Sequence, residues 1–316
     1  MKLITSVVIA AATIAVISSA AVAQNIKLGI VVETLGNPYF ACVKRAAEDE
    51  AKLHPEVDLT VLGAAVGTDL IGMTKMIDDL IQLKVDVLAF NAIDPNAMVQ
   101  TAKRVEAAGI PVLIHSDDLS EKVARHFVGP DQYFGQFSVA IAVAEQLGGK
   151  GKIALMEGVP GNMSSILRKN GAKDALAKYS GIKLVGTWAA NWDRAQGLKK
   201  AEDILTAHPD LSAIIAVNDD MALGALQAVK ARGKLGEIIV TGFNGVEEAM
   251  QEVYRGNMLA TVLTYCDSVG KQLVRTGIDV AKGQDDKSKY TIDTGTIPLD
   301  TKLLKAIGGH LKAAVK

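Results

Sequence analysis

Short apolar runs alternate with amphipathic segments along most of this sequence, and the alternation is what most constrains the fold. Between two such runs, for example, Leu70, Met73, Ile77 and Leu80 recur at helical spacing. Wholly apolar strands separated by helices are typical of parallel sheets that helices cover on both faces. The sequence therefore predicts an α/β fold with right-handed crossovers.

The alternation starts twice, which predicts two doubly wound parallel-sheet lobes. The expected strands of the first array are 26–32, 57–62, 85–90 and 112–115, with helices at 39–53, 70–83 and 96–108. The expected strands of the second array are 152–156, 182–188, 213–217, 238–241 and 260–263, with helices at 131–147, 165–177, 193–206, 220–230, 246–254 and 267–282. No long Pro- or Ser-rich linker separates the arrays, so we expect short strand-like crossings between the lobes.

Composition excludes one class of partner. The chain has 316 residues, enough for two domains, and 49% of them are hydrophobic. Its formal net charge of −1 lacks the concentrated positive charge that nucleic acid requires, so we expect no nucleic-acid partner.

The N-terminus reads as a secretory signal peptide covering residues 1–23. Lys2 precedes an apolar stretch at 3–17, and the small residues that follow end in Ala21-Val22-Ala23, which suits cleavage after Ala23. An uncleaved membrane anchor is the alternative, because the apolar stretch is nearly long enough to span a bilayer. The main prediction is a periplasmic protein with no membrane insertion after cleavage.

Recognisable catalytic and cofactor motifs are missing from the sequence. It contains no phosphate-binding loop, no dinucleotide-binding glycine pattern and no nucleophile elbow. Its five histidines are scattered without the spacing of metal ligands. We therefore expect a protein that is not an enzyme and that has neither a cofactor nor a metal. The two cysteines, Cys42 and Cys266, could pair in an oxidising compartment or could be small buried hydrophobic residues, and the sequence leaves this open.

Polar residues that follow the predicted strands are candidates for a ligand site, because open α/β sheets bind ligands at the carboxyl ends of their strands. In the first array these candidates are Glu33, Asn37, Asn91, His115, Ser116 and Asp117. In the second array they are Glu157, Asn191, Trp192, Asn218 and Asn244.

Four segments resemble the periplasmic sugar-binding proteins of the ribose type. They are Gly29–Phe40, Asn191–Gly197, Ala216–Ala225 and Gly242–Gly245, and the resemblance extends in order over essentially the whole chain after the signal peptide. It implies a two-lobed type I binding protein with hinge crossings near 128–130, 264–265 and 292–294. The implied lobes are 24–128 with 265–292, and 129–264 with 293–316.

The resemblance also implies what the protein does and with which partners. A small polyhydroxylated ligand would hold the lobes closed, and the closed form, expected to be a monomer, would dock on an ABC permease that works with its ATPase. The resemblance assigns ligand contacts to Asn37, Tyr39, Phe40, Trp192 and Asn218. Aromatic rings suit the apolar faces of a sugar ring, and amides bind its hydroxyls.

Other positions depart from the ribose-type pattern. Ser116 and Asp117 stand in place of an Asp-Arg pair, Asn244 in place of Asp, Thr264 in place of a hinge Gln, and Glu33 in place of a small residue. Ile166 stands where a second arginine is expected, although Arg168 lies close by. We expect both ligand-clamping arginines to be lost and the pocket to be acidic, which disfavours an acidic sugar.

The main hypothesis for the ligand is a neutral pentose, hexose or polyol, whose hydroxyls would donate to Glu33 and Asp117. A cationic amino sugar is the alternative, because a buried carboxylate requires a partner. Ligand sensing for a chemoreceptor or sensor kinase is a second alternative to transport. An enzyme would need an acid–base pair drawn from Glu33, His115 and Asp117, which we regard as the weakest hypothesis.

Overall fold

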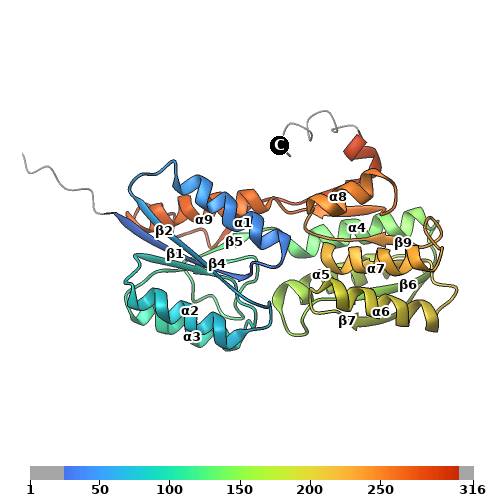
Figure 1. Cartoon of the computed structure of the whole chain (residues 1–316), viewed down its shortest axis with the longest axis horizontal. Coiled ribbons are helices and arrows are strands. Elements are labelled where there is room, and N and C mark those ends of the chain that lie inside the picture. Colours follow the sequence, from blue (N-terminus) through green and yellow to red (C-terminus); the bar gives the residue numbers. More distant parts are fainter. Residues whose placement is uncertain (1–24, 306–316) are drawn as a thin grey trace, which may run out of the picture.

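The chain forms two α/β lobes, each built on a six-stranded sheet, in a computed structural model that describes residues 25–305 (Figure 1). Across the first sheet the order is β2 (Val57–Ala64), β1 (Ile26–Thr34), β3 (Val87–Phe90), β4 (Val112–His115), β5 (His126–Gly129) and β11 (Thr291–Asp293). Across the second it is β7 (Gly181–Ala189), β6 (Lys150–Glu157), β8 (Ala213–Ala216), β9 (Ile239–Thr241), β10 (Ala260–Leu263) and β12 (Ile297–Asp300). The predicted two-lobed fold is confirmed.

Helices cover both faces of each sheet. The first lobe carries α1 (Pro38–Ala51), α2 (Leu70–Gln82), α3 (Ala97–Ala107) and α9 (Cys266–Ala281). The second carries α4 (Gln132–Gln146), α5 (Met163–Leu176), α6 (Arg194–Ala207), α7 (Asp219–Ala231) and α8 (Glu247–Tyr254). In β1, Leu28 and Ile30 pack toward the core that includes α1 and α9, whereas Val31 packs toward the core that includes α2 and α3. This two-sided burial explains why the strand is apolar without interruption from Leu28 to Val32.

Side chains cap the N-termini of most of the described helices. Asn37 Oδ1 accepts a hydrogen bond of 2.9 Å from Tyr39 N, with Pro38 as the first helical residue of α1. Asp193 caps α6, accepting from Gln196 N at 2.8 Å. Asn218, rather than either aspartate that follows it, caps α7.

The chain passes between the lobes three times, because β5 and β11 belong to the first sheet while β10 and β12 belong to the second. The crossings touch each other: Thr294 N donates to Gly129 O at 3.2 Å, and the Tyr265 ring lies beside Gly295. The sequence did not predict the strands β5, β11 and β12, and β12 pairs antiparallel with β10. The lobe boundaries themselves stay a prediction.

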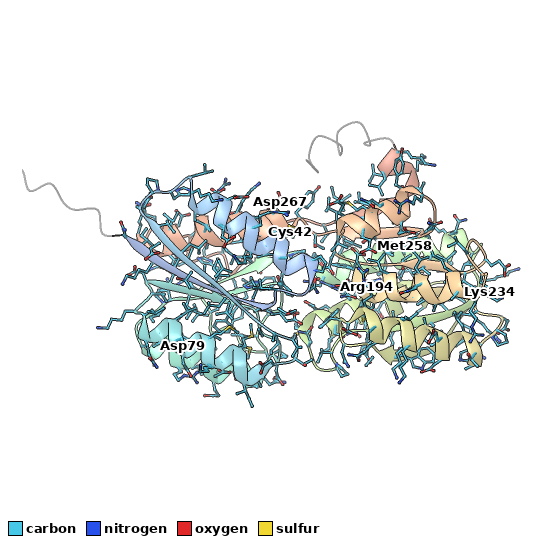
Figure 2. The ribbon with its side chains drawn as sticks, in the orientation of Figure 1. Cys42, Asp79, Arg194, Lys234, Met258 and Asp267 are labelled. Carbon is cyan, nitrogen blue, oxygen red and sulfur yellow. A yellow bond between two sulfur atoms is a disulfide. The ribbon has the colours of Figure 1, made fainter. Side chains whose placement is uncertain are left out.

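Cys42 in α1 and Cys266 at the start of α9 form a disulfide that closes a loop of 224 residues (Figure 2). The bond joins two helices of the first lobe that pack side by side, and Cys266 directly follows the second crossing. This resolves the pairing that the sequence left open.

The predicted signal peptide, residues 1–23, lies outside the described residues. From residue 25 to residue 305, none of the helices combines the length and the apolar character needed to cross a bilayer.

Candidate functional site

A small pocket lies between the lobes, at the carboxyl ends of strands from both sheets. The residues that line the pocket are Glu33, Asn37, Tyr39, Phe40, Ser116, Asp117, Ser164, Arg168, Trp192, Asn218 and Asn244. Most of the residues predicted from the sequence therefore meet in one cavity.

The first turn of α1 supplies an aromatic wall. Tyr39 and Phe40 are both buried, and their rings meet edge to face with centroids 5.2 Å apart. The Tyr39 hydroxyl is 3.4 Å from Ser116 Oγ, which ties α1 to the loop after β4. The Asn37 cap fixes the helix start and thereby sets where both rings lie.

Two buried carboxyl groups lie on the same side of the pocket. Glu33 is 5% exposed and Asp117 is 4% exposed. Burial raises the pKa of Glu33 well above its ordinary value, the negative charge of Asp117 raises it further, and Arg168 opposes the shift. Burial also raises the pKa of Asp117, against hydrogen bonding by Ser164 and the charge of Arg168.

Arg168 supplies the positive charge of the pocket, which corrects the expectation that both arginines are lost. Arg168 is 6% exposed, and its guanidinium stacks on Phe243, with Cζ 3.8 Å from the ring centroid. Nε donates to Gln132 Oε1 at 2.8 Å, and Nη1 donates to Val217 O at 2.7 Å. The alignment ambiguity at Ile166 misled the sequence analysis, because Arg168 lies two residues further along α5, about half a turn of helix away, and it is Arg168 that lines the pocket.

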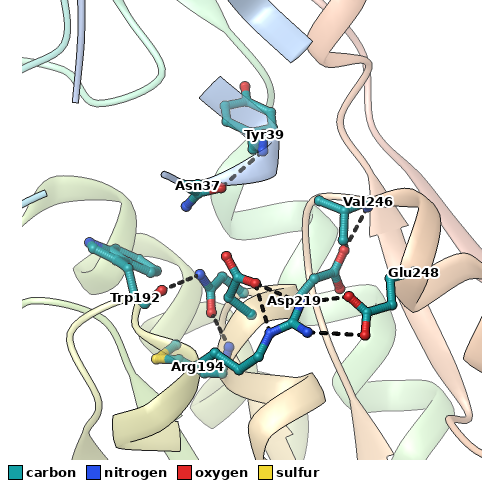
Figure 3. A network of polar contacts seen from close by, with 10 residues as sticks. Asn37, Tyr39, Trp192, Arg194, Asp219, Val246 and Glu248 are labelled. Carbon is teal, nitrogen blue, oxygen red and sulfur yellow. Dashed lines mark hydrogen bonds and ion pairs between the residues drawn. The ribbon is translucent and has the colours of Figure 1, made fainter. Parts of the chain in front are cut away.

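Trp192 forms the aromatic wall of the second lobe, and Figure 3 shows it facing Asn37 and Tyr39 of α1. Its ring lies against Gly158, where any Cβ would overlap the indole. Asn218 Nδ2 donates to Trp192 O at 3.2 Å while Asn218 Oδ1 accepts from Met221 N at 2.9 Å. Asn218 therefore caps α7 and also holds the loop that carries the tryptophan.

Backbone strain is concentrated at this site. Ser116, Trp192 and Asn244 line the pocket with φ angles of 61°, 63° and 121°, in a region that non-glycine residues rarely adopt. Such strain persists where the surrounding structure enforces it, and it is typical of ligand-binding positions.

A second network supports the pocket from the side of α7 (Figure 3). Asp219 is fully buried and accepts from Thr261 Oγ1 at 2.6 Å and from Val246 N at 2.8 Å. Asp220 instead pairs with Arg194, which also reaches Glu248 at 2.8 Å. Asp219 therefore joins α7 to β10 and to the loop before α8, and Asp220 joins α7 to α6.

The lobes touch across the cleft. Ser164 N donates to Asp117 Oδ1 at 3.2 Å, and Ser164 Oγ donates to Ser116 O at 3.0 Å. Gln132 Nε2 donates to the same carbonyl at 2.9 Å. Ser164 and Arg168 are pocket residues that the sequence analysis did not predict. The sequence offered one signal for them, because both lie in the first turns of α5, which Asn162 caps, shortly after a strand of the second lobe.

Two predicted site residues do not line the pocket. His115 is fully buried, with Nε2 3.1 Å from Val31 O, and burial lowers its pKa to about 4. Thr264 is also buried, and its hydroxyl donates to Asn244 O at 3.2 Å. Among the wider candidates, Glu157 pairs with Lys169, while Asn191 lies in an outer groove at the cleft mouth.

Within residues 25–305, no group of His, Cys, Asp and Glu side chains is arranged to hold a metal ion. What the pocket offers chemically is two facing aromatic walls, amide and hydroxyl groups, and a charge set of one arginine and two carboxyl groups. This suits non-covalent capture of a small polar ring.

Comparison with known proteins agrees with this geometry. The family model described as "Periplasmic binding protein domain" matches residues 28–285. The ribose import binding protein of Bacillus subtilis is 32% identical over 261 residues, covering 83% of this chain and 83% of that protein. The D-allose-binding periplasmic protein of Escherichia coli is also 32% identical over 261 residues, covering 80% of this chain and 84% of that protein.

Solved structures are similar over most of their length. An ABC transporter periplasmic solute binding protein from Actinobacillus succinogenes with bound D-allose has a TM-score of 0.83 and 30% identity, covering 89% of this chain and 99% of that chain. A solute binding protein from Bacillus halodurans with bound myo-inositol has a TM-score of 0.85 and 25% identity, covering 91% of this chain and 98% of that chain. The sequence match and the fold together show that this chain belongs to the periplasmic binding protein family.

Proposed function

We propose that this protein captures a neutral monosaccharide or cyclic polyol between its lobes and delivers it to the permease of an ABC importer. The observation that carries the proposal is the pocket between the lobes, which is lined by Tyr39 and Phe40 of one lobe and by Trp192 of the other. Rings on opposite walls can contact both apolar faces of a sugar, while Asn37 and Asn218 beside them can bind its hydroxyls.

Charge balance supports a neutral ligand. Arg168 keeps its positive charge at neutral pH, because burial lowers its pKa only to about 10. Asp117 and Glu33 oppose it, but their raised pKa values favour retention of a proton by the pair. The pocket is therefore close to neutral. An ammonium would meet Arg168 and a carboxylate would meet the acidic pair, so neither an amino sugar nor an acidic sugar is favoured.

The relatives support the same ligand class. The curated relatives are named for ribose and allose, and solved neighbours hold D-allose, myo-inositol and D-fucose. All of these are uncharged and polyhydroxylated. Their membership in ABC import supports transport, with a permease and its ATPase as partners, over sensing by a chemoreceptor. We likewise propose that residues 1–23 direct the chain to the periplasm, where it acts as a monomer without catalysing a reaction.

A thermal-shift assay of the chain from Gln24 onward tests the capture proposal. The panel is D-ribose, D-allose, D-fucose, myo-inositol and the amino sugar D-glucosamine. A ligand at one hundred times its Kd should stabilise the fold by about 2.7 kcal/mol, which corresponds to a rise in Tm of several degrees. We expect such a rise with at least one neutral member and none with D-glucosamine.

The two tryptophans provide a matched control. Trp192→Ala should abolish the ligand-induced rise in Tm. Trp188→Ala should keep it, because Trp188 lies in β7 beside His208 and does not line the pocket. A panel without any stabilising sugar, or equal shifts in the two variants, would overturn the proposal.

A further inference from the structure

The order of strands in the first sheet brings two carboxyl groups to one amide. Glu33, Asn91 and Asp117 lie at or just beyond the ends of β1, β3 and β4, which are neighbours in the sheet, with β3 in the middle. Asn91 Nδ2 therefore lies 3.4 Å from Glu33 Oε2 and 3.5 Å from Asp117 Oδ2. One NH₂ group donates weakly to both carboxyl groups and holds them near each other.

The buried carboxyl group of Glu33 has few hydrogen-bond donors around it. Among the described residues, its carboxyl group receives a hydrogen bond from Asn91 alone. On its other side Glu33 lies against Gly67, where a Cβ would overlap Oε1. Asn91 is fully buried, and its Oδ1 has no partner within residues 25–305. A buried carboxylate with so few donors is costly, whereas a protonated one is not.

The charged and titratable groups around the pair come from several elements. Asp117 is negative and comes from the loop after β4, and Arg168 is positive and comes from α5. Arg168 acts on the carboxyl groups through space, because its Nε and Nη1 donate elsewhere. The Tyr39 hydroxyl of α1 has a pKa raised by burial, and His115 in β4 is neutral, so neither adds charge near pH 7.

The burial of the pair depends on the closed arrangement of the lobes. Ser164 of the second lobe covers Asp117 through the bond from its backbone nitrogen, and most of the lining residues are buried, with Asn37 and Trp192 partly exposed. A ligand can enter such a pocket only if the lobes separate. Separation admits water to Glu33 and Asp117 and removes the donor that Ser164 provides to Asp117.

We propose that ligand capture is coupled to uptake of a proton by the Glu33–Asp117 pair, with Asn91 as the residue that positions the two carboxyl groups. The inference rests on the proposed capture function and adds its coupling to pH. It also assigns Glu33 a role in ligand selection, because a protonated carboxyl both donates to and accepts from hydroxyl groups, which suits an uncharged polyol.

The sign of the coupling follows from where the carboxyl group is buried. In the open state water returns the pKa of Glu33 toward its ordinary 4.5, whereas in the closed state burial and Asp117 raise it. The closed, liganded state therefore binds more protons in the window between these two pKa values. Affinity should fall as pH rises through that window, by at most about tenfold in Kd per pH unit for one proton.

Isothermal titration calorimetry near pH 6.5 measures the proton directly. The sugar from the panel that gives the largest rise in Tm is titrated into the wild-type protein in phosphate and in imidazole buffer, whose ionisation enthalpies differ. We expect the apparent binding enthalpy to change with the buffer in the direction of proton uptake, by up to about one proton per site. Glu33→Gln should remove this dependence, because an amide cannot titrate.

Glu157→Gln is the matched control, because Glu157 ends β6 in the second lobe, pairs with Lys169 at 2.6 Å and does not line the pocket. It should retain the wild-type proton uptake. Binding with no buffer dependence in the wild-type protein, or a dependence that Glu33→Gln retains, would overturn the coupling while leaving capture intact. Absence of binding by every panel member would overturn both.

Discussion

A methyl group at Gly158 should displace the tryptophan of the pocket without touching the ligand. Gly158 directly follows β6, and a Cβ built there would lie well inside 3.0 Å of three atoms of the Trp192 indole. The ring would have to move by roughly 1 Å to restore ordinary contact. Trp192 is already held at φ 63° with its carbonyl bonded to Asn218, so the shift must come from the side chain.

The loss of affinity can be worked from the contact that the ring gives up. If the indole withdraws from roughly 60–100 Å² of the apolar face of a sugar, the lost burial is worth about 1.5–2.5 kcal/mol. That corresponds to an increase in Kd of about 10- to 70-fold. Overpacking at this site should also lower the free energy of unfolding by about 1–3 kcal/mol.

The assay is calorimetric titration of Gly158→Ala with the sugar that stabilises the wild-type protein most. Gly36→Ala serves as the control, because a Cβ there would approach nothing closer than Thr34 Oγ1 at 3.6 Å. We expect wild-type affinity for the control. Wild-type affinity for Gly158→Ala would refute the role of Trp192 as a wall of the ligand site.

Three further predictions concern the cap, the buried histidine and the disulfide. Asn218→Ala should raise Kd at least tenfold, measured by calorimetric titration, and should lower the free energy of unfolding by about 1 kcal/mol, measured by urea unfolding. Asp69→Ala removes the cap of α2 and serves as the control, because it should lower the free energy of unfolding without changing Kd. His115 has a pKa of about 4 in the folded protein and 6.5 in the unfolded protein. Its contribution to the free energy of unfolding is therefore fully present above pH 6.5 and is lost as the pH falls toward 4. Wild-type protein should therefore lose up to about 3 kcal/mol more than His115→Gln across that range in urea unfolding, and parallel pH profiles would contradict this. Asp219, whose pKa is raised to about 6, contributes with the opposite sign and is common to both proteins. Replacing Cys42 and Cys266 by Ser should cost about 2–5 kcal/mol, seen as a lower Tm, and a reductant should lower the Tm of wild-type protein but not of the variant.

The fold and most of the pocket residues could be predicted from the sequence for the same physical reason. In a parallel sheet covered on both faces, each strand is wholly apolar, and the polar residue that follows it lies at the ligand edge. Glu33 at the end of β1, Asp117 after β4 and Asn218 after β8 were found in this way. The Asn37 cap also has a local signal in the sequence, because an asparagine before a proline is typical of a helix start.

The sequence-based predictions were wrong at residues whose orientation depends on the rotation of a helix or on the packing of the core. Arg168 was passed over because Ile166 occupied the aligned position, although only the arginine points into the cleft. His115 follows the pattern of a strand-end residue, yet its ring turns inward to Val31 O. The strands β11 and β12 are short and join the sheets through partners far away in sequence, so no local pattern predicted them.

The sequence by itself determined the alternation of strands and helices, the restart of that pattern and the residues at the strand ends, because these depend on local periodicity and capping. Tertiary structure alone decided that Arg168 faces the two carboxyl groups, that Asn91 bridges them, and that Cys42 meets Cys266. Those contacts join residues of different strands, helices and lobes. Their distances follow from strand order and lobe closure, which no window of sequence contains.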